Sequence, residues 1–87
     1  MYYIVYSSIT FATGIKNKFR YDREKITVMH TPSEISGGGC SYCIEVSTPE
    51  KALEIVKGSE EYGVTVMGIY EKKDNAYIKR SLSDDIS

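Results

Sequence analysis

Apolar and polar positions change period several times along the chain, which predicts alternating strands and helices. Residues 2–8, YYIVYSS, are aromatic or β-branched and carry no charge, as expected for a buried strand. Over residues 11–19 the apolar positions recur every three or four residues, which predicts a helix that a preceding serine or threonine can cap.

The middle of the chain reads as two strands separated by a loop. Residues 25–31 alternate apolar and polar side chains, and Pro32 ends this second strand because proline donates no ladder hydrogen bond. A loop follows, PSEISGGGCS, in which serines can cap a single helical turn after Pro32. Residues 42–47 alternate again and predict a third strand.

A second helix and a fourth strand complete the pattern. Thr48 and Pro49 are typical of an N-cap and a first helical residue, and this helix is expected to end near Gly63. The apolar residues of 64–70 predict the fourth strand, and the following EKKDN is expected to be a turn.

The resulting order, βαββαβ, predicts an α+β fold of the ferredoxin-like type, with an antiparallel sheet and two helices on one of its faces. We assign residues 1–73 to a single domain. Residues 74–87 form a polar C-terminal extension, with a short edge strand at 76–79 and a frayed tail beyond it. At least one tyrosine of the first strand should lie on the face without helices, and a homodimer through that open face would bury it.

Charge and length exclude several classes of function. The 87 residues contain 11 Lys and Arg against 12 Asp and Glu, a net charge of −1, without a block of like charges. Binding of nucleic acid or of an anionic membrane therefore lacks its electrostatic driving force. Neither a signal peptide nor an apolar run of membrane-spanning length is evident, so a cytoplasmic protein is expected.

The strongest chemical signal is a CxxC motif, Cys40 and Cys43, entered from the glycines Gly37, Gly38 and Gly39. In a reducing compartment free, reactive or metal-bound thiols are expected there. The glycine run, with Ser41, predicts an accessible binding loop whose N–H groups can converge as an anion nest beside Cys40 and lower the pKa of its thiol.

The two cysteines are expected to differ. Strand alternation turns Cys43 away from the helices, whereas Cys40 lies in the loop. Cys40 is therefore the candidate reactive thiol and Cys43 the candidate resolving thiol, able to attack a modified Cys40. His30 is a possible accessory group, although a surface imidazole at a strand end is the simpler interpretation.

Other interpretations of the motif remain open. A thioredoxin-like redox site usually opens a helix, while here a strand follows, and a zinc site needs about four ligands, more than one CxxC and one histidine provide. Both thiols can also be incidental buried groups. We expect neither a metal nor a cofactor. A thiol-disulfide redox protein, a non-catalytic interaction domain and a dimer in which each of two subunits contributes a cysteine pair to a bridging metal stay alternatives.

Four segments together resemble the selenium/sulfur carrier-like family of small bacterial proteins, a family of unknown function: YYIVYSS, TPSEISGGGC, YCIEV and VTVMGIY. The resemblance extends from Tyr2 to about Lys72, and its most specific part is Thr31-Pro32-x-x-Ile35-Ser36 leading to Cys40. The chain departs from the family at residues 7–13, SSITFAT, where members often carry histidine and an alanine-rich helix.

The resemblance implies that Cys40 accepts a sulfur or selenium atom as a persulfide or perselenide and passes it to an acceptor protein. Such a protein is more a carrier than an enzyme. Its expected partners are sulfur or selenium donor and acceptor proteins.

Overall fold

The computed structural model describes residues 1–20, 26–39 and 41–80. Its elements, in chain order, are β1 (Tyr2–Tyr6), α1 (Ile9–Lys18), β2 (Thr27–His30), α2 (Ser33–Ser36), β3 (Tyr42–Val46), α3 (Pro49–Glu61), β4 (Gly68–Lys73) and β5 (Ala76–Arg80). The predicted α+β class is confirmed. The ferredoxin-like βαββαβ order is not, because the chain adds the short helix α2 between β2 and β3 and the strand β5 after β4.

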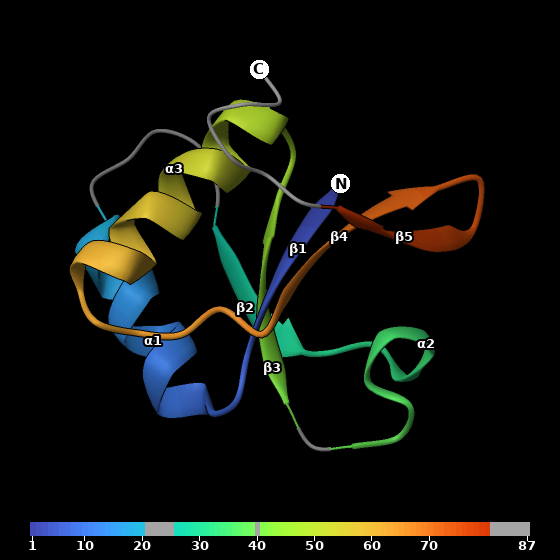
Figure 1. The fold of residues 1–87 in the computed structure, drawn as a ribbon, viewed down its shortest axis with the longest axis horizontal. Coiled ribbons are helices and arrows are strands. Elements are labelled where there is room, and N and C mark those ends of the chain that lie inside the picture. The colour runs from blue at the N-terminus through green and yellow to red at the C-terminus, as the bar shows by residue number, and fades with distance from the viewer. Residues whose placement is uncertain (21–25, 40, 81–87) are drawn as a thin grey trace.

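The five strands form one antiparallel sheet in the order β2-β3-β1-β4-β5 (Figure 1). The central strand, β1, pairs with both β3 and β4, so that Ile4 lies opposite Ile44 on one side and Ile69 on the other. Segments from the beginning, middle and end of the chain therefore meet at the centre of the sheet.

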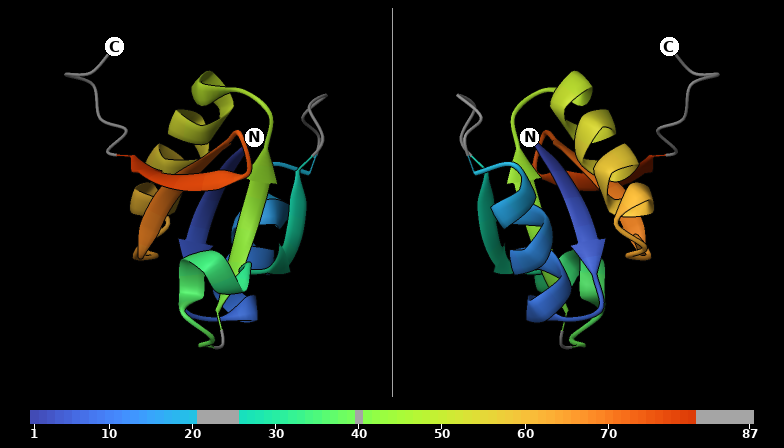
Figure 2. Two further views of the ribbon diagram at one scale, coloured as in Figure 1. Left: turned by 90° about the vertical axis from the view of Figure 1, so that its right-hand side faces the viewer. Right: turned by 90° about the vertical axis from the view of Figure 1, so that its left-hand side faces the viewer.

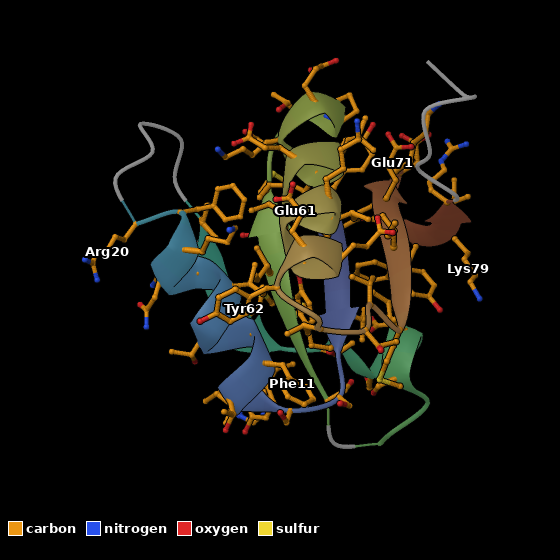
Figure 3. All side chains as sticks on the ribbon, turned by 60° about the vertical axis from the view of Figure 1, so that its left-hand side comes forward. Phe11, Arg20, Glu61, Tyr62, Glu71 and Lys79 are labelled. Carbon is orange, nitrogen blue, oxygen red and sulfur yellow. The ribbon has the colours of Figure 1, made fainter. Side chains whose placement is uncertain are left out.

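The long helices α1 and α3 lie together on one face of the sheet (Figure 2). Between them and the strands is the main core, whose fully buried members include Ile4, Tyr6, Ala12, Ile15, Ile44, Ala52 and Ile55. Phe11 and Tyr62 lie at the outer surface of this layer, where their side chains are exposed (Figure 3). This arrangement matches the expected pair of helices on one face.

The opposite face carries a second, smaller cluster built on Tyr3, Val5 and Cys43. The helix α2 contributes Ile35 to it, and β5 contributes Tyr77, whose ring contacts Tyr3 edge-on at a centroid distance of 5.5 Å. Tyr3 is only 4% exposed as a result. This part of the face is covered by the chain itself, and the homodimer stays a prediction.

The predicted caps of the long helices are confirmed, whereas that of the short helix is wrong. The Ser8 hydroxyl accepts from the N–H of Phe11, and the Thr48 hydroxyl accepts from the N–H of Lys51. The helix α2 starts after Pro32 at its N-cap and has no side-chain cap. This short helix ends at Gly37, its C-cap, in the left-handed conformation.

The boundaries of the fourth strand differ from the prediction. Residues 64–67 are irregular, although the N–H of Met67 donates to the Val5 carbonyl at 2.8 Å. The strand instead continues to Lys73, because only Asp74 and Asn75 form the turn into β5. Both have positive φ, 51° and 67°, as two-residue hairpin turns of type I′ require. The tail expected to fray is 80–87. Its first residue, Arg80, is instead the last residue of β5, and its other residues, 81–87, lie outside the described residues.

Candidate functional site

The glycine run follows α2 and closes a tight turn. Gly37 and Gly38 have φ of 66° and 90°, a left-handed conformation that glycine adopts without steric cost. The N–H of Gly37 donates to the Ser33 carbonyl, that of Gly38 to the Ser36 hydroxyl and that of Gly39 to the Ser36 carbonyl. Because all three N–H groups are used within the turn, they do not form the expected open anion nest.

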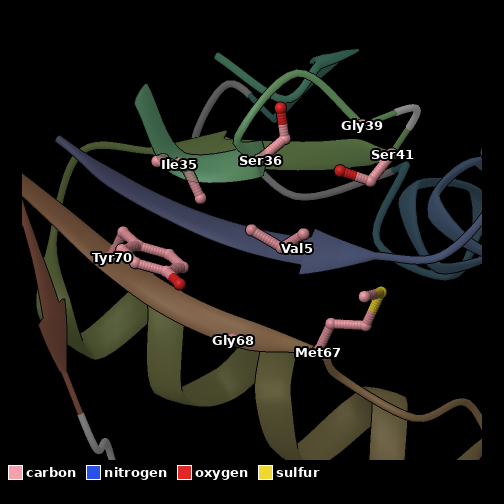
Figure 4. A pocket seen from close by; sticks show the side chains of 8 residues that line it. All are labelled: Val5, Ile35, Ser36, Gly39, Ser41, Met67, Gly68 and Tyr70. Carbon is pink, nitrogen blue, oxygen red and sulfur yellow. The ribbon is translucent and has the colours of Figure 1, made fainter. Parts of the chain in front are cut away.

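Beside this turn is a pocket of about 230 Å³ on the sheet face opposite α1 and α3 (Figure 4). Its floor is Val5 of β1. Its remaining walls come from α2 and the loop after it, and from the start of β4: Ile35, Ser36, Gly39, Ser41, Met67, Gly68 and Tyr70. These groups are apolar side chains, glycines and hydroxyls, so none of the described residues that line the pocket is charged.

Cys40, the candidate reactive thiol, lies outside the described residues. Its two neighbours in the chain, Gly39 and Ser41, both line the pocket. Of the predicted binding loop, Gly39 and Ser41 therefore face this pocket, whereas Gly37 and Gly38 are not among its lining residues. Two described residues of the segment that the sequence singled out thus lie in the pocket wall.

Cys43 is fully buried in the smaller cluster, opposite Val5 on the neighbouring strand. The predicted orientation, away from the long helices, is confirmed. Burial raises the pKa of its thiol to about 11, with the Glu45 carboxylate acting in the same direction and the Thr31 hydroxyl in the opposite one. Little thiolate exists at neutral pH, so the resolving role stays a prediction that requires the thiol to become accessible.

Thr31 connects the buried thiol to the loop. Its N–H donates to the Ser41 carbonyl at 3.0 Å, which ties the end of β2 to the start of β3. Met29 pairs with Cys43, so Thr31, two residues later, is a diagonal neighbour of Cys43 on the same sheet face. Among the described residues, its buried hydroxyl oxygen has no hydrogen-bond partner.

His30 is exposed and packs against Tyr42, with ring centroids 4.5 Å apart and a tilt of 36° between the rings. Tyr42 and Val28 both pack toward the main core. His30 lies opposite Tyr42 and two residues after Val28 on β2, so its side chain is on the same face of the sheet as theirs. The structure therefore places His30 on the helix-covered face and does not bring it to the pocket.

A comparison with known families identifies the chain. Residues 1–71 match the family described as "Putative Se/S carrier protein-like". The chain belongs to this family. The predicted resemblance is confirmed, and every residue that lines the pocket lies within the matched region. No curated protein and no solved structure matches the chain.

The β4 side of the pocket in this Se/S carrier-like protein was not predicted from sequence. Met67, Gly68 and Tyr70 reach Val5 only because β4 pairs with β1, a long-range contact that local periodicity does not contain. Gly68 was the available signal, since a glycine inside a strand pattern often marks a close approach of another group.

Within residues 1–20, 26–39 and 41–80, no group of three or more His, Cys, Asp or Glu side chains could hold a metal ion. None of the helices in those ranges is long and apolar enough to cross a membrane.

Proposed function

We propose that this protein carries one sulfur or selenium atom on Cys40, as a persulfide or perselenide, with the carried atom held at the pocket. The observation that carries the proposal is that Gly39 and Ser41, the residues bonded to Cys40, both line that pocket. Membership of the Se/S carrier-like family supports the choice of cargo.

The pocket suits a cargo of very few atoms. Its volume of about 230 Å³ is smaller than the roughly 300 Å³ at which pockets for drug-sized ligands begin. Apolar walls from Val5, Ile35 and Met67 reduce the access of water, and hydroxyl groups supply hydrogen bonds. A large, polarisable sulfur or selenium atom, whose charge is diffuse, matches such walls better than an oxyanion, which requires cationic side chains or free N–H groups.

Loading needs no external oxidant when the donor is itself a persulfide. The Cys40 thiolate attacks the outer sulfur of the donor, a new S–S bond forms at Cys40, and the S–S bond of the donor breaks. The donor leaves as a thiolate with the electron pair of the broken bond. Delivery is the same exchange with an acceptor thiolate as the nucleophile. The proposed partners are accordingly thiol-bearing donor and acceptor proteins, in a reducing cytoplasmic compartment.

Cys43 has a defined place in this scheme. If it becomes accessible, its thiolate attacks the Cys40 sulfur of the persulfide, a Cys40–Cys43 disulfide forms and hydrosulfide leaves, with no other reductant needed. Its burial and raised pKa keep this step slow and favour delivery to an acceptor.

We also propose a ferredoxin-like unit within this fold, made of β1, α1, β2, β3, α3 and β4, to which α2 and β5 are additions. The sheet order β2-β3-β1-β4-β5 supports this proposal.

The test is intact-protein mass spectrometry after exposure to glutathione persulfide, comparing wild type, Cys40→Ser and Cys43→Ser. Wild type and Cys43→Ser are expected to gain the mass of one sulfur atom that a thiol reductant removes, and Cys40→Ser is expected to gain none. Equal loading of Cys40→Ser and wild type would overturn the proposal. A wild-type protein that only loses two hydrogens would indicate a disulfide redox protein instead.

A further inference from the structure

Tyr70 lies along β4 with its ring over Gly68, and Figure 4 shows its hydroxyl directed toward that glycine. A Cβ atom at residue 68 would lie 3.0 Å from Cε1 of the Tyr70 ring and 3.6 Å from its hydroxyl oxygen. The shorter distance is tighter than ordinary van der Waals contact. The missing side chain of Gly68 therefore sets where the phenol of Tyr70 lies in the pocket wall.

Within the part of the chain that the structure describes, three hydroxyl groups line the pocket, and they differ in their hydrogen bonds. The Ser36 hydroxyl accepts from the N–H of Gly38 at 3.3 Å. The hydroxyls of Ser41 and Tyr70 have no hydrogen-bond partner among the described residues, so their protons are available to a ligand. They come from different walls, Ser41 from the loop before β3 and Tyr70 from β4.

We propose that Tyr70 is a binding residue whose hydroxyl, together with that of Ser41, donates a hydrogen bond to the carried sulfur or selenium atom, and that Gly68 provides the clearance for this phenol. The inference rests on the proposed function and names the groups that hold the cargo. It assigns a role to β4, which the sequence did not connect with the cysteine loop.

The chemistry of the cargo requires such donors. The terminal atom of a persulfide or perselenide carries negative charge once its proton is lost, and none of the described side chains that line the pocket is cationic to balance it. Hydroxyl donors fixed in an apolar wall stabilise a developing anion more strongly than mobile water does. Tyr70 is well fixed, because its backbone is paired with Tyr3 on β1 and with Lys79 on β5.

The experiment measures the equilibrium constant for sulfur exchange between glutathione persulfide and the protein, by intact mass, in wild type and in four variants. Tyr70→Phe keeps the ring and removes the hydroxyl, and is expected to lower the constant about three- to tenfold, the effect of one hydrogen bond. Gly68→Ala keeps the hydroxyl but displaces the ring, and is expected to lower the constant as well. Tyr62→Phe, at an exposed tyrosine on the helical side, is the matched control and is expected to leave it unchanged.

The fourth variant, Cys40→Ser, separates the two proposals. If it takes up sulfur as wild type does, the proposed function fails. If it takes up none while Tyr70→Phe and wild type have equal constants, the carrier function holds and the role of Tyr70 is overturned. Urea unfolding of each variant shows whether it is folded. Should Tyr70→Phe not fold, Gly68→Ala decides alone, and an unchanged constant in that variant overturns the inference.

Discussion

The hydroxyls of Tyr6 and Ser59 share a 2.7 Å hydrogen bond between β1 and α3, and both side chains are fully buried. The Ser59 hydroxyl also donates to the Ile55 carbonyl one turn earlier at 2.8 Å. Because that bond uses the only proton of Ser59, Tyr6 must be the donor in the pair. Two hydrogen bonds in series thus cross the main core and fix α3 against the central strand.

Because Tyr6 donates and Ser59 accepts, removing the two hydroxyls should have unequal effects on stability. Ser59→Ala leaves the buried Tyr6 hydroxyl without an acceptor, so we expect the free energy of unfolding to fall by about 1 to 3 kcal/mol. Tyr6→Phe leaves Ser59 bonded to Ile55 and is expected to cost only about 0.5 to 1.5 kcal/mol. Urea unfolding of both single variants and the double variant measures this, and a larger loss for Tyr6→Phe than for Ser59→Ala would contradict the assigned direction.

Two glycines within helices provide opposite predictions for the same substitution. A Cβ atom at Gly58 in α3 would lie 2.7 Å from Cζ of Phe19, whereas one at Gly14 in α1 has its nearest contact at 3.8 Å, with Tyr62. Alanine is favoured over glycine in a helix by roughly 0.5 to 1 kcal/mol. Gly14→Ala is expected to gain about that amount in unfolding free energy.

Gly58→Ala should instead lose about 1 to 2 kcal/mol, because the added methyl group must displace the Phe19 ring. Thermal unfolding of the two variants beside wild type measures both effects. Stabilisation by Gly58→Ala would show that the Phe19 ring moves aside without cost, and that the contact does not fix the packing of α1 on α3.

Local sequence signals account for much of this fold. The cap at Thr48 followed by Pro49 set the start of α3, and strand alternation placed Cys43 on the face away from the helices. These features depend only on neighbours in the chain. Val64 and Val66 misled the same reasoning, because both pack against the main core from an irregular segment while alternating as a strand does.

The candidate site likewise has one part that the sequence pattern marks and another that it does not. Gly39 and Ser41 belong to a loop whose composition marks it in the sequence. Gly68 and Tyr70 face that loop only through the pairing of β4 with β1, and nothing in their local pattern specifies which strand they will pair with. Long-range strand order is therefore the information that the sequence pattern lacked.

The β4–β5 turn yields a prediction about the backbone. Asn75 has a φ of 67° and lies between Asp74 and the first residue of β5. A non-glycine residue other than Asn or Asp loses roughly 1 to 2 kcal/mol in this conformation. Asn75→Ala is expected to lower the unfolding free energy by about 1 kcal/mol and to speed hydrogen exchange in β4 and β5. Asn75→Gly, the control, is expected to keep both near wild type, and equal exchange in the two variants would contradict the assigned turn.

The burial of Cys43 predicts how stability depends on pH. Its thiol has an ordinary pKa of 9.0, and burial raises this value to about 11 in the folded protein. Above pH 9 the unfolded chain therefore loses the thiol proton while the folded chain keeps it, so the contribution of Cys43 to stability decreases between pH 9 and 11. In a Cys40→Ser background, Cys43 is the only thiol left in the chain.

The measurement is the difference in unfolding free energy between Cys40→Ser and Cys40→Ser/Cys43→Ala, taken at pH 8 and at pH 10. Both proteins share all their other ionisable groups, so contributions that do not involve Cys43 cancel in the difference. We expect the advantage of the protein that retains Cys43 to shrink at the higher pH.

Alkylation of Cys43 by iodoacetamide should also be slow until urea unfolds the chain, because the thiol is both buried and protonated. Rapid alkylation of the folded protein at neutral pH would show that Cys43 is accessible, and would restore it as a resolving thiol that acts without any structural opening.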